Sequence, residues 1–154
     1  MDLARVVAHL LALAASYVLA LPIAWNREKE ARSAGLRTFP LVAIATCSVV
    51  LATDRLLEGA PEGMARIVQG LMSGMGFIGG GAILKTRHYV HGTATAASLW
   101  ATGAMGVAVG LGAYDVAVML SLVTFLTLRV MLPFKRNAEE DVEPDEDDKK
   151  VRMS

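Results

Sequence analysis

The sequence has a single cysteine and no net charge, and each of these limits what the chain can be. Cys47 lies inside an apolar run, which excludes a disulfide framework. The balance of 15 basic and 15 acidic residues hides an uneven distribution, because the charges gather between apolar runs and near the C-terminus. We expect no nucleic-acid partner for such a chain.

Recognisable catalytic arrangements are also missing. There is no Ser-His-Asp set, no paired carboxylates and no phosphate loop, so we expect neither an enzyme nor a bound cofactor. The run GMGFIGGG lies in an apolar segment with no strand before it, which argues against a dinucleotide fingerprint. His88 and His91 are three residues apart without a third ligand, and such a pair is more often part of an ordinary loop than a metal site.

Apolar residues are abundant, at 54% of the chain, and they fall into five runs. These runs are Val6 to Trp25, Phe39 to Ala52, Arg66 to Leu84, Thr93 to Gly112, and Val116 to Pro133. The first has about twenty uncharged residues, enough to cross a bilayer core of ~30 Å. It is too long for a cleavable signal peptide, and no small-residue cleavage site closes it before Pro22.

The five runs predict an all-α membrane protein built as a bundle of about five transmembrane helices. Residues 1–136 would form one transmembrane domain, and residues 137–154 an acidic, disordered cytoplasmic tail. The segment Asn26 to Thr38 is predicted to be a short charged loop with Gly35 as a turn or C-cap residue, and Leu56 to Ala65 a short loop that carries Gly59, Pro61 and Gly63.

The third run, RIVQGLMSGMGFIGGGAIL, holds six glycines. In a bilayer a helix must satisfy its own backbone, and glycine then lets another backbone come close. On a helical wheel one arc collects small and polar residues, and Gly79 alone among the glycines lies with the bulky ones. The arc comprises Arg66, Gln69, Gly70, Ser73, Gly74, Gly76, Phe77, Gly80 and Gly81. We expect this arc to face protein and the bulky side to face lipid, although the glycines alone also fit an ordinary packing seam.

The fourth run has a similar stripe of small residues, formed by Ala96, Gly103, Gly106 and Gly110. Two neighbouring helices with small faces are expected to pack on each other. The two faces together exceed what one bundle obviously needs, so a homo-oligomer is a further expectation.

Basic residues indicate the orientation through the positive-inside rule. One side of the predicted bundle carries Arg27, Lys29, Arg32, Arg37, Lys85, Arg87, Lys135 and Arg136, and the other carries Arg5, Arg55 and Arg66. The first side is therefore expected to be cytoplasmic, with the N-terminus outside and the C-terminus inside.

Ionisable residues near a membrane usually have partners, because an isolated charge is costly there. We hypothesise that Glu28 pairs with Arg37 at the inner surface, and that Asp54 pairs with Arg66 across a short connection. Both pairs could equally be structural. We expect Lys29, Glu30 and Arg32 to be solvated loop charges.

Three segments together resemble the MgtC/SapB family of small inner-membrane proteins. They are Arg27-Glu28 followed by Ala34-Gly-Leu-Arg37-Thr38, then the SGMGFIGGGAI run after Arg66, and finally Val90, Gly92, Thr95-Ala96-Ala97 and Trp100. The chain departs from the family at Asn26, where an acidic residue is usual, and at Ala24, where glycine is usual. The resemblance covers about residues 5 to 135, and longer relatives add a soluble C-terminal domain.

The resemblance implies a bacterial inner-membrane protein with a role in magnesium homeostasis or adaptation to low magnesium. Some members resemble modulators of the proton-driven ATP synthase that act through helix contacts within the membrane, so that enzyme or a transporter is an expected partner. The alternative is a small magnesium transporter or channel subunit. The absence of acidic residues from the third and fourth runs favours the regulator. The candidate functional residues are Arg27, Glu28, Arg37, Asp54, Arg66, Gln69, Gly74, Gly76, Gly80, Gly81, Thr95 and Trp100, with no metal ligands.

Overall fold

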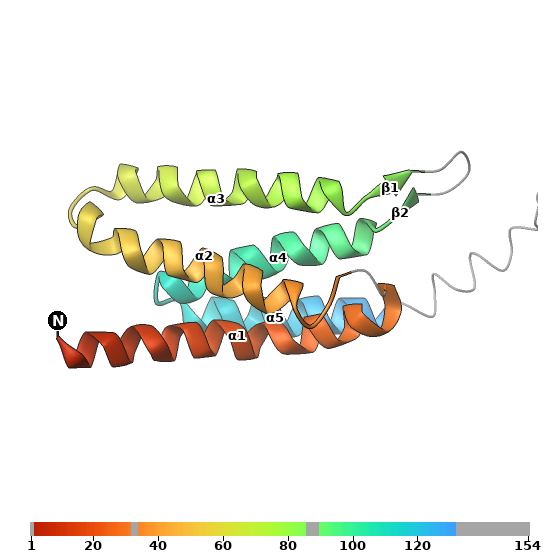
Figure 1. Cartoon of the computed structure of the whole chain (residues 1–154), viewed down its shortest axis with the longest axis horizontal. Coiled ribbons are helices and arrows are strands. Elements are labelled where there is room, and N and C mark those ends of the chain that lie inside the picture. Colours follow the sequence, from red (N-terminus) through yellow and green to blue (C-terminus); the bar gives the residue numbers. More distant parts are fainter. Residues whose placement is uncertain (1, 32–33, 86–89, 132–154) are drawn as a thin grey trace, which may run out of the picture.

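The computed structural model describes residues 2–31, 34–85 and 90–131 (Figure 1). Within these ranges the chain is almost entirely helical. The predicted acidic tail and its boundary at residue 136 lie outside the described residues, as does His88.

Five α-helices form the bundle, which confirms the all-helical fold. They are α1 (Leu3–Ala31), α2 (Thr38–Asp54), α3 (Pro61–Gly81), α4 (Thr93–Gly110) and α5 (Tyr114–Val130). A short 3-10 helix, η1 (Arg55–Leu57), follows α2. Between α3 and α4 the chain forms a two-stranded antiparallel hairpin of β1 (Leu84–Lys85) and β2 (Val90–His91), with Leu84 opposite His91.

Two helices, α1 and α3, extend beyond the predicted apolar runs by more than one helical turn. The first continues past Trp25 to Ala31, because glutamate, lysine and alanine are good helix formers and no glycine intervenes before Gly35. The third begins at Pro61, a residue well suited to a first helical turn, with Glu62 beside it at the positive end of the helix dipole. The predicted loops at Asn26 to Thr38 and Leu56 to Ala65 are therefore shorter than expected.

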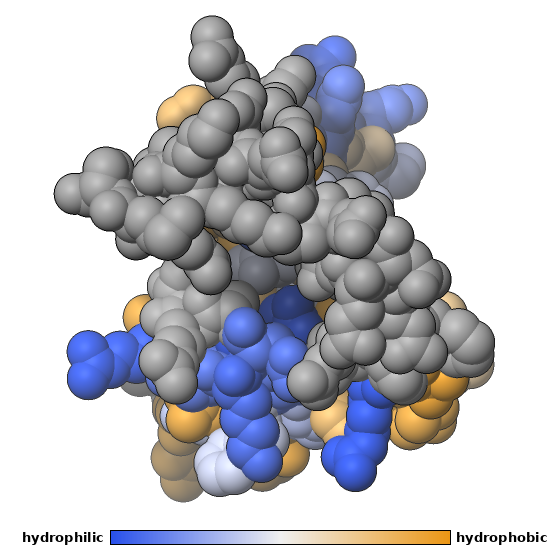
Figure 2. Space-filling view, turned by 90° about the vertical axis from the view of Figure 1, so that its right-hand side faces the viewer, coloured by the Kyte–Doolittle hydropathy of each residue, from blue (hydrophilic) through white to orange (hydrophobic). Residues whose placement is uncertain are grey.

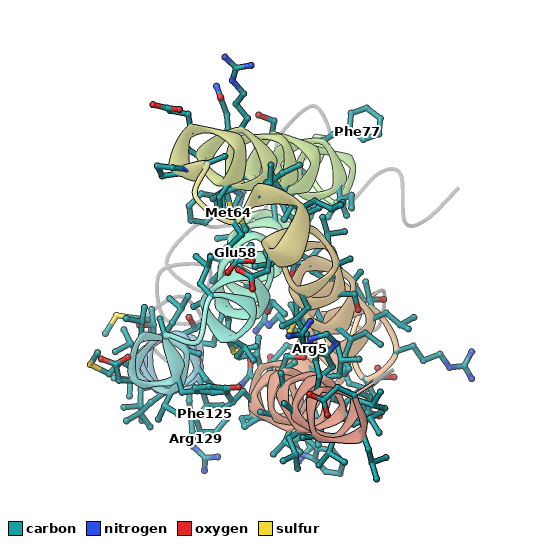
Figure 3. The ribbon with its side chains drawn as sticks, turned by 90° about the vertical axis from the view of Figure 1, so that its left-hand side faces the viewer. Arg5, Glu58, Met64, Phe77, Phe125 and Arg129 are labelled. Carbon is teal, nitrogen blue, oxygen red and sulfur yellow. The ribbon has the colours of Figure 1, made fainter. Side chains whose placement is uncertain are left out.

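The helices are stacked in three tiers (Figures 1 and 3). The outermost tier is α3 alone, α2 and α4 form the middle tier, and α1 and α5 form the opposite side. The most extensive contacts are between α2 and α4 and between α1 and α2, and α4 contacts all four other helices. The centre of the fold is therefore α4. Most of the contacts that α3 makes are with α4.

Glycines on α4 let its neighbours approach closely. A Cβ at Gly106 would meet Thr46 Oγ1 and the Ala43 carbonyl of α2, and one at Gly110 would meet Val50. Gly103 leaves room for the Met75 side chain of α3. Because there is no hydrophobic drive between helices in lipid, such close packing is a main source of association.

The turn between α1 and α2 is held by one acidic side chain. Glu28 Oε2 accepts a hydrogen bond from the Leu36 backbone N–H at 3.0 Å. A Cβ on the buried Gly35 would collide with Glu28, so glycine is needed for this approach. On the other side of α1, Ser121 Oγ of α5 donates to the Leu19 carbonyl at 2.7 Å and joins the two helices.

The outer surface of the bundle is rich in large apolar side chains. Exposed examples occur on every helix, among them Leu10, Leu41, Phe77, Trp100 and Leu122. Soluble monomers rarely expose apolar area so widely, whereas a bilayer favours it. By length and composition, Leu3–Glu30 is the one described segment suited to crossing a membrane, and Thr38–Asp54 is apolar but shorter. The number of membrane spans thus stays a prediction.

We predict that Gly106→Ala destabilises the fold while Gly74→Ala does not. The added methyl at position 106 would meet α2 backbone, and overpacking of this kind costs about 1–3 kcal/mol. At position 74 nothing lies within 4 Å, so the substitution removes only the helix penalty of glycine. Thermal unfolding of both variants in one detergent measures the contrast. Equal midpoints would contradict the assignment of Gly106 to a tight contact.

We also predict that Glu28→Ala lowers stability by about 0.5–1.5 kcal/mol, the typical net value of one hydrogen bond. The lost bond is the one to the Leu36 N–H. Glu58→Ala is the matched control, since Glu58 is also exposed and has no side-chain hydrogen bond in the part of the chain that the structure describes. Denaturant unfolding of the two variants should separate them, and identical curves would argue against a structural role for Glu28.

Candidate functional site

One face of α3 points away from every other helix. We call it the outer α3 face; it consists of Arg66, Gln69, Gly70, Ser73, Gly74, Gly76, Phe77, Gly80 and Gly81, all of them exposed. A Cβ at any of its five glycines would meet nothing within 4 Å. Figure 3 shows Phe77 projecting from α3 away from the bundle, and its side chain is 86% exposed. The prediction that this face packs on the small face of the fourth run is therefore wrong.

The bulky side of α3 makes the intramolecular contact instead. Met75 and Gly79 are buried, with Met75 beside Gly103 and Gly79 against the Ala96 backbone of α4. A long flexible methionine fills the notch that a glycine on α4 leaves, and this pairs a large residue with a small one. Two small faces would have left less to interlock, which explains why α3 is turned around from the expected orientation.

The outer α3 face combines polar side chains with glycines that leave the helix backbone accessible. Arg66, Gln69 and Ser73 offer hydrogen-bond donors and acceptors, and their side chains have no hydrogen bond within the described ranges. The glycines beside them would let a second helix approach to backbone contact. Chemically, the face is suited to binding another helix rather than to catalysis.

The two predicted ion pairs are not formed in the described part of the chain. Asp54, the last residue of α2, and Arg66 are both exposed and unpaired there. Glu28 binds the Leu36 N–H instead of Arg37, which is exposed in the turn before α2. The carboxylate of Glu28 thus stabilises backbone geometry.

Other candidate residues lie at the end of the bundle that Figure 2 faces, where hydrophilic side chains gather among the coloured residues. Arg27 and Thr95 both line a cavity of about 800 Å³ between the ends of α1 and α5 and the start of α4. Arg27 is 6% exposed, and its Nε and Nη2 donate to Asn26 Oδ1 at 3.2 and 2.8 Å. Trp100 is on α4 but half-exposed, away from this cavity lining.

Sequence reasoning missed several residues of this cavity. Glu30, expected to be a solvated charge, lines it together with the hydroxyl residues Ser98, Thr124 and Thr127. The hydroxyl spacing on α4 and α5 is a weak signal, since such residues also bond their own helix, as Ser98 does to the Ala94 carbonyl at 2.7 Å. Among the residues that the structure describes, no group of three or more His, Cys, Asp or Glu side chains could hold a metal ion.

Comparison with known proteins supplies the family. The sequence profile of the MgtC family matches residues 13–137. The chain is 36% identical to protein SrpB of Synechococcus elongatus over 127 residues, which cover 74% of this chain and 68% of SrpB. It is 34% identical to protein MgtC of Salmonella typhimurium over 115 residues, or 75% of this chain and 48% of that protein. It is 32% identical to the "putative magnesium transporter YhiD" of Escherichia coli over 114 residues, or 70% of this chain and 53% of YhiD.

The match therefore spans about half the length of MgtC and of YhiD. No solved structure shows significant similarity to this fold. The matched profile covers α2 to α5 and most of α1, including both the outer α3 face and the cavity. From this match and these identities, the chain belongs to the MgtC family.

Proposed function

We propose that this protein is a multi-pass regulator of the bacterial inner membrane, with its N-terminus outside, that acts by binding another membrane protein through α3. The single observation that carries the proposal is the outer α3 face. Facing lipid, Arg66, Gln69 and Ser73 would expose polar groups at a substantial cost. A partner helix seated on the glycines would satisfy those groups and shield them from lipid.

The process regulated is magnesium homeostasis. The support is membership of the MgtC family and the name of the relative YhiD, which associates that protein with magnesium transport. The proposed partner is the membrane sector of the ATP synthase, as the family resemblance implies, and a second copy of this chain or a transporter is the competing occupant. All three would use the same helix face.

The alternative function is magnesium transport by the protein itself, which the name of YhiD favours. Against it, α3 after Glu62 and the whole of α4 contain no acidic residue that could supply the oxygen ligands magnesium prefers. Purified protein in liposomes loaded with a magnesium-sensitive dye tests this alternative. Magnesium entry driven by the protein alone would contradict the regulator.

We predict that Gly74→Leu weakens partner binding about tenfold without unfolding the protein. Its side chain would enter open space in the isolated chain but would obstruct a docked helix. Capture of the ATP synthase membrane sector from detergent-solubilised membranes should fall about tenfold, as expected for a contact cost of ~1–3 kcal/mol. Helix content and melting temperature should stay unchanged.

Val118→Leu on α5 is the matched control, because it also places a leucine at an exposed position of a helix. It should leave capture intact. In cells, Gly74→Leu should reproduce the growth defect of a deletion strain in low magnesium. Capture by Gly74→Leu at the wild-type level would refute docking on α3, and the absence of any low-magnesium phenotype in the deletion strain would remove the magnesium role.

A further inference from the structure

The cavity of about 800 Å³ at the end of α1 is a separate feature from the outer α3 face, and its lining residues have a different chemistry. Its walls come from the last turns of α1, the first half of α4 and the second half of α5. All three helices contribute polar groups to it: Arg27 and Glu30 come from α1, Thr93 and Thr95 from α4, and Thr124 and Thr127 from α5. The rest of the α5 side is apolar and is formed by Val123, Leu128 and Met131.

The N-terminus of α4 opens into this cavity. Gly92 is the N-cap, in a left-handed conformation with φ of 84°, and no side chain caps the helix. The first three residues of the helix, Thr93, Ala94 and Thr95, all line the cavity. Their backbone N–H groups have no partner within the helix, and the helix dipole adds positive potential at this end. An anion is the ligand that such a terminus favours.

The buried guanidinium of Arg27 is an independent indication that the cavity favours an anionic ligand. Arg27 lines the cavity with only 6% of its surface exposed. Its bonds go to the neutral side chain of Asn26, and no carboxylate forms an ion pair with it in the described part of the chain. Glu30 is the nearby acidic group and offsets part of this buried charge from an exposed position, so an anionic group in the cavity would complete the site.

The remaining lining narrows the class of anion. Glu30, one helical turn from Arg27, is exposed at the same cavity and would repel a purely anionic ligand. A ligand with both a phosphate and an ammonium group matches both charges. Val123 and Met131 are more than half exposed on the outer surface, so the cavity is continuous with apolar surface that a bilayer would cover.

Aromatic and basic residues indicate that this end of the bundle lies at head-group depth. Trp25 is 55% exposed, and Lys29 Nζ lies 4.9 Å from its ring centroid. Tryptophan and lysine of this kind are typical of the membrane interface. On α5, the labelled Arg129 points away from the bundle in Figure 3.

We propose that the cavity binds a phospholipid head group, with its phosphate on Arg27 and the first turn of α4 and its ammonium beside Glu30. Phosphatidylethanolamine has both groups, and its acyl chains would leave along the α5 side. The bound lipid fixes the ends of α1, α4 and α5 relative to one another.

Native mass spectrometry of the full chain in detergent, titrated with phosphatidylethanolamine, tests the proposal. We expect one tightly bound lipid, weakened about tenfold or more by Arg27→Gln, since a charge-assisted hydrogen bond is lost. Asn26→Asp should weaken binding similarly, because it places a carboxylate on the guanidinium that Asn26 now contacts, without removing a side chain that the fold uses. Lys29→Gln is the matched control and should bind as the wild type does.

Two further arms separate the sources of phosphate and the role of Glu30. Inorganic phosphate at millimolar concentration should not displace the lipid, because the apolar side of the cavity contributes to binding. Phosphatidylglycerol should bind more weakly than phosphatidylethanolamine, and Glu30→Gln should remove that preference. Lipid binding that is unchanged in both Arg27→Gln and Asn26→Asp would overturn the proposal, as would displacement of the lipid by free phosphate. Gly74→Leu should leave lipid binding unaffected, which separates this site from helix docking on α3.

Discussion

The contact between α2 and α4 at Gly106 is the constraint on which the rest of the fold depends. With no side chain at that position, Thr46 and the Ala43 carbonyl of α2 lie directly against the α4 backbone. Because α4 also contacts α1, α3 and α5, its position fixes theirs. In the multi-pass arrangement that we propose, lipid offers no hydrophobic force to bring helices together, so the closeness of this contact has to supply much of the stabilisation. A glycine that weakens a helix in water therefore strengthens the assembly here.

The same argument explains which way α3 faces. One long side chain, Met75, fits the space left by Gly103, and Gly79 lies against Ala96. Once those contacts are made on the bulky side, the small and polar side must point outward. The molecule thus has a well-packed interior seam on α4 and a second surface of similar composition on α3 that no other described helix covers. The first holds the helices of one chain together, and the second is the face that we propose binds another helix.

The sequence predicts the number and approximate limits of the helices well, because apolar run length and turn residues are local properties. It places the start of α4 at Thr93 correctly, and it misses the extension of α1 to Ala31 because charged helix formers look like a loop between apolar runs. It fails on the facing of α3, since the choice between two sides of one helix depends on the shape of a neighbour far along the chain. For the same reason, the hydroxyl residues of α5 cannot be assigned to a cavity with Arg27 before the fold is known.

The central place of α4 has a consequence for how the protein is made. Synthesis proceeds from the N-terminus, so α1, α2 and α3 are complete before the helix that contacts all of them exists. At that stage α1 and α2 can already pair through their own contact, but α3 lacks its main neighbour. In the nascent chain, α3 therefore cannot take its final position until α4 has been synthesised. The final arrangement of the helices forms late during biogenesis.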